Sequence, residues 1–357
     1  LGFTGLIFIL IFLYYQPKFN KPYLLVCIIL IFILDLFFAN YGNYQKKQVS
    51  EVNQLEENAK FIQADSSKSR IYLTPDTRSN AIERKNLQWD SIKISKEKFT
   101  MGMLGNTKIF QTQGLEVIRQ TRWENLKELI DSAPTLETTQ LLNLMNVKYI
   151  VSKQELASPN FEKVQESFPV SKEQIKKANL KEPYSIKIYE NKNVFPRAFL
   201  VSGCKIIEED QGFKNEFLDK KINFKALILL DKNPENFNCT GEVSKVKEGS
   251  VKITSYKSNT VDLTVISKTR QFLFMGDSYY PGWKAYVDGE EKEILRANYL
   301  FRSVLIEPGE HTLRFEYDPL SFKLGLTITL LTILVSLIYF IRACVVRPAK
   351  IDINLPA

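Results

Sequence analysis

The feature that most constrains this chain is an apolar run near its C-terminal end. Residues 322–341 contain a single charge, Lys323, beside the start of the run. An α-helix needs about 20 apolar residues to cross the hydrocarbon core of a bilayer. The run therefore predicts a membrane span, and the alternative is a buried helix of a water-soluble protein.

A second apolar region opens the chain. Residues 22–39 carry one charge, Asp35, whereas the run over residues 1–15 is short for a span. The chain begins at Leu1 inside this region, without the basic start and small-residue cleavage site of a signal peptide. We therefore expect a C-terminal piece of a longer membrane protein. It would have two transmembrane helices in residues 1–39, the first truncated, and another in residues 321–342.

Basic residues near the spans predict the orientation. Lys18 and Lys21 lie between the first two spans, and Arg342, Arg347 and Lys350 follow the last one. Two helices separate these clusters, so both clusters lie on one side, which the positive-inside rule makes cytoplasmic. We expect a multi-pass protein of the cell membrane, with residues 40–320 extracytoplasmic and residues 343–357 forming a cytoplasmic tail.

The hydrophobic periodicity of the region between the spans changes along its length. Residues 40–230 alternate helical periodicity with short strand-like runs, which predicts an α/β region. Residues 231–320 hold short strand-like runs separated by turn signals, among them the hairpin signal Asp288-Gly289, and predict an antiparallel β-sandwich. The predicted fold class is membrane-anchored α+β: transmembrane helices flank an extracytoplasmic α/β unit that is followed by the sandwich.

Aromatic residues concentrate in the segment GDSYYPGWKAYVDG, residues 276–289. Tyr279, Tyr280 and Trp283 could stack on sugar rings and are the candidate carbohydrate-binding residues. The alternative is that these side chains belong to the sandwich core or to a rim at the lipid headgroups, where Tyr and Trp concentrate.

Two aspartates are candidates for a polar site. Asp277 has no obvious structural role, in contrast to Asp288 and Asp318, which occupy turn positions. Asp35 lies within a predicted span, where an ionisable group is often functional, although it could also reach the interface. Spacing alone assigns neither aspartate to catalysis.

Several other functions have little support in the sequence. A single His argues against a His-based metal site or catalytic triad, and no nucleotide-binding or hydrolase motif is present. We expect no cofactor and no metal. The net charge of +8 is spread along the chain and predicts no nucleic-acid partner. Cys204 and Cys239 could oxidise in an extracytoplasmic domain, but the sequence cannot pair them.

Several motifs resemble the C-terminal end of the YfhO-type bacterial membrane proteins, which are related to lipid-dependent (GT-C-type) glycosyltransferases. They are SYYPGWKAYVDG (residues 278–289), ILRANYLFRSV (294–304), PGEHTLRFEYDP (308–319), LLNLMNVKYIVS (141–152) and FPRAFLV (195–201). The resemblance implies a longer set of N-terminal spans, and transfer of sugars from polyprenyl-phosphate donors to envelope polymers such as teichoic acids. It places the catalytic acidic residue in an early extracytoplasmic loop that has no match here, so the catalytic residues are unknown and this piece is expected to be inactive.

Two hypotheses for function follow. The chain could be part of a glycosyltransferase-like protein that glycosylates a cell-envelope polymer or lipid, or a non-catalytic carbohydrate-binding or envelope-assembly protein. The expected partners are membrane lipid, a polyprenyl-phosphate sugar and an envelope glycopolymer.

Overall fold

The computed structural model describes residues 56–78, 94, 96–99, 109–112, 120–177, 184–219, 222–235, 237–243 and 249–345, together with Ile29 and Leu34. The chain divides into two compact units, one formed by Leu1–Gln54 with Leu320–Ala357 and the other by Leu55–Pro319. The spans predicted in residues 1–39, and Asp35 with them, lie outside the described residues apart from Ile29 and Leu34.

Apart from Ile29 and Leu34, the described part of the first unit is one long helix, α12 (Leu320–Val345). Residues Leu320–Arg342 of this helix are long and apolar enough to cross a membrane, and they are the one such segment among the described residues. Bulky apolar side chains along the helix, such as Leu330, Ile333 and Phe340, are more than half exposed. A helix that is apolar on every side suits lipid rather than water.

The second unit begins with a mixed five-stranded sheet, here called sheet A, with strand order β2-β1-β3-β5-β4. Its strands are β1 (Arg70–Leu73), β2 (Phe110–Gln111), β3 (Val147–Ser152), β4 (Phe161–Ser167) and β5 (Ile186–Asn191). β1 pairs in parallel with β2 and β3, whereas β3, β5 and β4 pair antiparallel. Helices α4 (Glu57–Gln63), α5 (Pro75–Arg78), α8 (Thr121–Ser132), α9 (Leu141–Leu144) and α10 (Lys172–Lys177) accompany the sheet.

Two further sheets form the rest of this unit. Sheet B has the order β6-β11-β15-β14-β8-β7 and sheet C the order β13-β12-β16-β10-β9. Sheet B contains β6 (Ala198–Val201), β7 (Gly203–Ile206), β8 (Leu227–Leu230), β11 (Gln271–Ser278), β14 (Leu295–Ala297) and β15 (Phe301–Ile306). Sheet C contains β9 (Gly249–Tyr256), β10 (Thr260–Ser267), β12 (Trp283–Val287), β13 (Glu290–Lys292) and β16 (Gly309–Tyr317), and α11 (Asp210–Leu218) connects β7 to β8.

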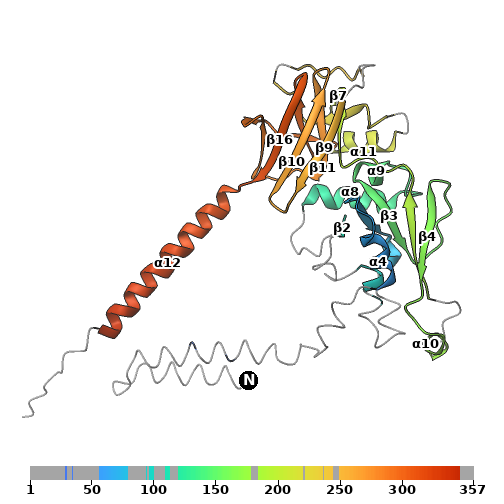
Figure 1. Cartoon of the computed structure of the whole chain (residues 1–357), viewed down its shortest axis with the longest axis horizontal. Helices are drawn as coiled ribbons and strands as arrows, with labels where there is room; N and C mark the ends of the chain where they lie inside the picture. Colours follow the sequence, from blue (N-terminus) through green and yellow to red (C-terminus); the bar gives the residue numbers. More distant parts are fainter. Residues whose placement is uncertain are drawn as a thin grey trace, which may run out of the picture. The chain divides into compact units, whose positions relative to one another are not determined.

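Alternation along the strands explains how the sheets pack. Leu273 and Met275 of β11 join the core between sheets B and C, whereas Phe272 and Phe274 of the same strand face a second core. That second core also holds Leu126 of α8 and Tyr72 of sheet A, so sheet B is buried on both faces. In Figure 1, α8 and α9 lie between the strands of sheet A and the strands of the sandwich.

The predicted hairpin at Asp288-Gly289 is confirmed. These residues join β12 to β13 with Val287 opposite Glu290, and both have positive φ, +53° for Asp288 and +88° for Gly289. This conformation gives a two-residue turn a twist that matches the strands on either side. The sequence Pro308-Gly309 also predicts a chain reversal, and in the structure this reversal carries the chain from β15 in sheet B to β16 in sheet C.

The predicted mixed α+β class is confirmed, and many of its elements lie where the periodicity placed them. The residue patterns predict short strands over residues 70–73 and 198–201 and a helix turn over residues 141–146, and the structure has β1, β6 and α9 at these places. Three strands of sheet B, β6 to β8, come from residues before 231, the start predicted for the sandwich. The sequence pattern of short buried strands did not show which sheet each strand joins.

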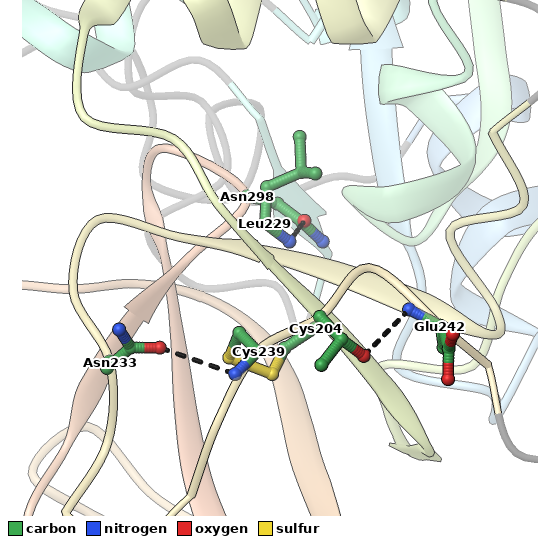
Figure 2. Close-up of a disulfide and its surroundings, with 7 residues drawn as sticks. Cys204, Leu229, Asn233, Cys239, Glu242 and Asn298 are labelled. Atoms are coloured by element: carbon green, nitrogen blue, oxygen red, sulfur yellow. Dashed lines mark hydrogen bonds between the residues drawn. A yellow bond between two sulfur atoms is a disulfide. The ribbon is translucent and has the colours of Figure 1, made fainter.

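A disulfide joins Cys204 of β7 to Cys239. Gly241 N donates to Cys204 O at 2.9 Å, and Cys239 N donates to the Oδ1 atom of Asn233 at 3.3 Å. Figure 2 shows these groups beside the neighbouring strand, where Leu229 N donates to the Oδ1 atom of Asn298 at 2.9 Å. The disulfide therefore fixes the segment that follows β8 against the edge of sheet B.

Candidate functional site

The candidate site is built around the end of strand β11 and the turn that follows it. The pairing of β11 with β15 shifts in register between Met275 and Ser278, so Asp277 lies at an irregularity in the ladder. Such irregularities re-aim a side chain. Gly276 lets other backbone approach, because a Cβ there would lie 3.0 Å from Leu144 O.

Asp277 lies at the centre of a buried cluster and accepts hydrogen bonds or ion pairs from the other members. This arginine cluster consists of Asp277, Arg70, Arg197, Arg302 and Tyr256. Arg197 donates to Asp277 Oδ1 from Nε at 3.1 Å and from Nη2 at 3.0 Å. Arg302 Nη2 and the Tyr256 hydroxyl donate to Asp277 Oδ2 at 3.1 and 3.0 Å. Arg70 completes the ion pairs through its Nη2 atom, which contacts Asp277 Oδ1.

The electrostatics of the cluster keep Asp277 ionised. Burial acts to raise the pKa of this carboxyl, but Arg70, Arg197 and Arg302 together outweigh burial and hold the pKa well below its usual range. Burial also raises the pKa of the Tyr256 hydroxyl to about 12, so that it stays a donor. A carboxylate held in this way is suited to organising arginines and not to exchanging a proton near neutral pH.

Aromatic rings cover the guanidiniums of the cluster. The Arg302 guanidinium carbon lies 3.9 Å from the centroid of the Trp283 ring, and that of Arg197 lies 4.1 Å from the centroid of the Tyr256 ring. Arg302 Nε and Nη1 are buried and form no hydrogen bond within the described part of the chain. The π face of Trp283 is therefore a main electrostatic partner of this side of Arg302.

Trp283 also lines an open cleft of about 410 Å³, here called the aromatic cleft. Tyr279 lines the same cleft, and the guanidinium carbon of Arg296 lies 4.8 Å from the centroid of the Tyr279 ring. The structure thus brings two of the three predicted carbohydrate-binding residues together. Each ring has a guanidinium packed on it, which restricts its motion.

The remaining walls of the aromatic cleft are highly polar. They are formed by Asp231, Lys232, Lys284, Glu291, Lys292, Glu293, Ile294 and Arg296. Arg296 Nη1 lies 3.0 Å from Asp231 Oδ2, and Lys284 Nζ lies 3.7 Å from Glu291 Oε2. Lys232 pairs with Glu293 across the chain segments that follow β8 and precede β14. Such pairs place donors and acceptors around two flat apolar rings.

Tyr280, the third predicted residue, does not line the aromatic cleft. Its side chain is 48 % exposed, and its ring centroid lies 6.4 Å from that of Tyr317. Tyr317 in turn packs against Trp283, with ring centroids 5.3 Å apart. Gly282, with a φ of +101°, allows the turn between Tyr280 and Trp283. Tyr280 therefore borders the site through Tyr317.

Asp288 and Arg314 do not line the cleft. Asp288 accepts hydrogen bonds from Thr312 N at 2.8 Å and pairs with His311 Nδ1 at 2.7 Å, which stabilises the start of β16. Arg314, whose side chain is largely exposed, pairs with Asp262 at the surface of sheet C. Asp35 lies outside the described residues.

Sequence reasoning missed the arginines that surround Asp277. Arg70 and Arg197 are 207 and 80 residues away in the chain, so no local pattern links them to this aspartate. Arg302 and Arg296 lie in the motif ILRANYLFRSV and are the part of the site that a local signal could have indicated. Their apolar neighbours in β14 and β15 made ordinary sheet positions the simpler interpretation.

Comparison with known proteins gives one match. The family model described as bacterial membrane protein YfhO matches residues 208–329, which confirms the resemblance over this segment. All residues that line the aromatic cleft fall within the matched segment, whereas Arg70 and Arg197 lie before it. No curated protein and no solved structure matches the chain.

Proposed function

We propose that this YfhO-type chain takes part in the glycosylation of a cell-envelope polymer or lipid, and that its contribution is to bind carbohydrate in the aromatic cleft. One observation carries the proposal: Tyr279 and Trp283 line the same polar cleft. Sugar rings have apolar C–H faces edged by hydroxyl groups. Flat rings framed by charged donors and acceptors complement both features.

The chemistry of the cleft favours binding over catalysis. Asp231, Glu291 and Glu293, the carboxylates of its walls, are each ion-paired with a Lys or Arg side chain. Asp277 is held ionised behind Trp283. Groups in such pairs orient a ligand by hydrogen bonds. Sugar transfer from a polyprenyl-phosphate donor, the activity implied by the glycosyltransferase resemblance, would then depend on groups outside the cleft.

An extracytoplasmic location of residues 40–320 is part of the same proposal. The disulfide between Cys204 and Cys239 supports it, because disulfides persist in oxidising compartments and are rare in the cytosol. A membrane-anchored domain on that face would meet envelope glycans and lipid-linked sugars directly.

The test is a binding measurement with matched tyrosine variants. The full chain is purified in a detergent without a sugar headgroup and titrated with envelope glycan fragments. Tyr279→Ala should weaken binding by about tenfold, since a central aromatic contact is lost. Tyr286→Ala is the control, because Tyr286 lies on β12 but lines no part of the aromatic cleft. Equal affinity of the wild type and Tyr279→Ala for every glycan bound would reject the cleft as the binding site.

A reconstitution separates binding from transfer. The chain in liposomes, supplied with a polyprenyl-phosphate sugar and a crude acceptor, should give no transfer above a protein-free control. Turnover in that assay would place catalytic groups within these residues, and Asp277 and Asp35 would be the first to mutate.

A further inference from the structure

A second pocket, here called the amide pocket, lies away from the aromatic cleft and shares no residue with it. Its volume is about 360 Å³, and it is formed where α9, the start of β4, the turn after β5 and the segment before β8 meet. Six side-chain amides line it: Gln140, Asn143, Asn160, Asn191, Asn193 and Asn223. Pockets that bind small ligands begin at about 300 Å³, so this one suits a ligand of one or two rings.

Some of these amides hold the pocket together. Asn191 Nδ2 donates to Asn143 Oδ1 at 2.8 Å and to Val147 O at 3.0 Å, and Asn191 Oδ1 accepts from Asn193 N at 3.0 Å. Phe195 N donates to Asn143 O at 3.2 Å, and Lys192 N donates to Asn160 O at 3.0 Å. These bonds tie the walls to sheet A, so the pocket is already formed without a ligand.

Other amide groups remain available for a ligand. Among the described residues, the side-chain amides of Asn160 and Asn193 form no hydrogen bond, and neither does Asn143 Nδ2. Gln140 Nε2 donates to Ile222 O at 3.2 Å, which leaves Gln140 Oε1 as an acceptor. The pocket therefore presents several donors and acceptors of neutral character.

The few charges around the amide pocket are already engaged. Lys192 Nζ lies 2.9 Å from Glu162 Oε2, and Glu137 accepts a hydrogen bond from the Ser158 hydroxyl. Lys225 Nζ lies 4.7 Å from the centroid of the Phe195 ring. An ionic ligand would have to compete with these contacts, whereas a neutral ligand would not.

Apolar side chains line part of the pocket. Phe161 and Phe195 are buried and line it together with Leu136, Leu142 and Val194. Gln140, which also lines the pocket, has a φ of +52°, a conformation that residues other than Gly rarely adopt and that is often found at binding sites. A lining that combines apolar side chains with neutral amides matches a molecule with C–H faces and hydroxyl edges.

We propose that the amide pocket is a second ligand site, and that it binds an uncharged sugar ring. Each hydroxyl of a sugar both donates and accepts hydrogen bonds, as each amide side chain does. The site differs in chemistry from the aromatic cleft, whose walls are charged, and it does not depend on that cleft. Two sites on one domain allow a glycan chain, or two separate glycans, to be held at once.

The test compares three variants of the full chain in a sugar-free detergent, with saturation-transfer NMR and titration against neutral methyl glycosides. Asn160→Leu keeps the approximate size of the side chain and removes its hydrogen-bonding groups. It should weaken binding by about three- to tenfold without loss of folding, since the Asn160 side chain forms no hydrogen bond within the described residues and the backbone bond from Asn160 N to the Ser158 hydroxyl is kept. Asn215→Ala, an exposed asparagine of α11 that does not line the pocket, should bind as the wild type does.

The third variant, Tyr279→Ala, separates this site from the aromatic cleft. Glycoside binding that is weakened by Asn160→Leu and kept in Tyr279→Ala supports the amide pocket. Binding that is lost only in Tyr279→Ala overturns the proposal and leaves the aromatic cleft as the single sugar site. Absence of glycoside binding, or binding of charged sugars alone, also overturns it.

Discussion

The guanidinium of Arg302 packs on the ring of Trp283, 3.9 Å from its centroid, and joins the candidate cleft to the buried charge behind it. Trp283 lines the open cleft, whereas the side chain of Arg302 is 2 % exposed and pairs with Asp277. The ring that we propose to hold a sugar is therefore supported by a network that extends to β1 through Arg70. We therefore expect binding in the cleft and the stability of the sandwich to be coupled at this contact.

Replacing Trp283 tests that coupling. Trp283→Ala removes a half-buried ring and the aromatic partner of Arg302, so we expect the free energy of unfolding to fall by about 2–4 kcal/mol. Trp283→Phe should restore most of the loss. The measurement is chemical denaturation of the full chain. Tyr280→Ala is the control and should change stability by less than about 1 kcal/mol, because Tyr280 is largely exposed. Equal stability of all the variants would contradict a structural role for Trp283.

Removing the charge of Asp277 should be more damaging. Asp277→Asn leaves three buried guanidiniums without their carboxylate, and we expect a loss of about 3–5 kcal/mol in unfolding free energy. Asp262→Asn breaks the exposed pair with Arg314 and should cost no more than about 1 kcal/mol. The unfolding free energies of both variants are measured by chemical denaturation. Similar losses in the two variants would mean that the arginine cluster contributes little to stability.

The same carboxylate predicts how stability depends on pH. The pKa of Asp277 is lowered in the folded protein, so its contribution is fully present above the pKa of the unfolded state, about 3.9, and is lost as pH falls toward the folded value. Unfolding free energy should therefore decrease below about pH 4 in the wild type. Asp277→Asn, if it folds, should lack this part of the decrease. If the unfolding free energy of the variant decreases below about pH 4 as steeply as that of the wild type, the decrease is due to other carboxylates.

The disulfide can be tested by paired serine substitutions. Cys204→Ser with Cys239→Ser opens a loop of 35 residues and should lower the free energy of unfolding by about 3–4 kcal/mol. Hydrogen exchange should become faster in residues 237–243, which the disulfide fixes against sheet B. The control is the double variant Cys27→Ser with Cys344→Ser, which should leave hydrogen exchange in residues 237–243 unchanged. Protection of residues 237–243 that survives removal of the disulfide would show that packing alone fixes the segment.

Topology is accessible through Ser250, which is exposed in β9. In a background with Cys27→Ser and Cys344→Ser, Ser250→Cys should react with a membrane-impermeant thiol reagent in intact cells. Lys350→Cys, in the predicted cytoplasmic tail, should react only after lysis. The opposite pattern would reverse the orientation and remove the basis for binding envelope glycans.

Local signals predicted much of the fold and only part of the site. Hairpin chemistry at Asp288-Gly289 and the bounds of β1 and β6 follow from nearby residues, and so sequence patterns find them. Tyr279 and Trp283 meet in one cleft because they flank a single turn. Arg197 reaches Asp277 because β6 pairs with β11 within sheet B, whereas Arg70 reaches it only through the packing of sheet A against sheet B. That contact, and the sheet to which β6, β7 and β8 belong, depend on long-range burial that no local periodicity encodes.

The connection from β16 to α12 has a mechanical consequence. β16 ends at Tyr317 and α12 begins at Leu320, so tension on the helix is delivered directly to a strand that has β10 on one side and β12 on the other. Both ladders are antiparallel, and a pull along the strand loads their hydrogen bonds together in shear, instead of opening them one after another. Sheet C is thus tethered through a central strand, the position from which a sheet resists being unravelled by force.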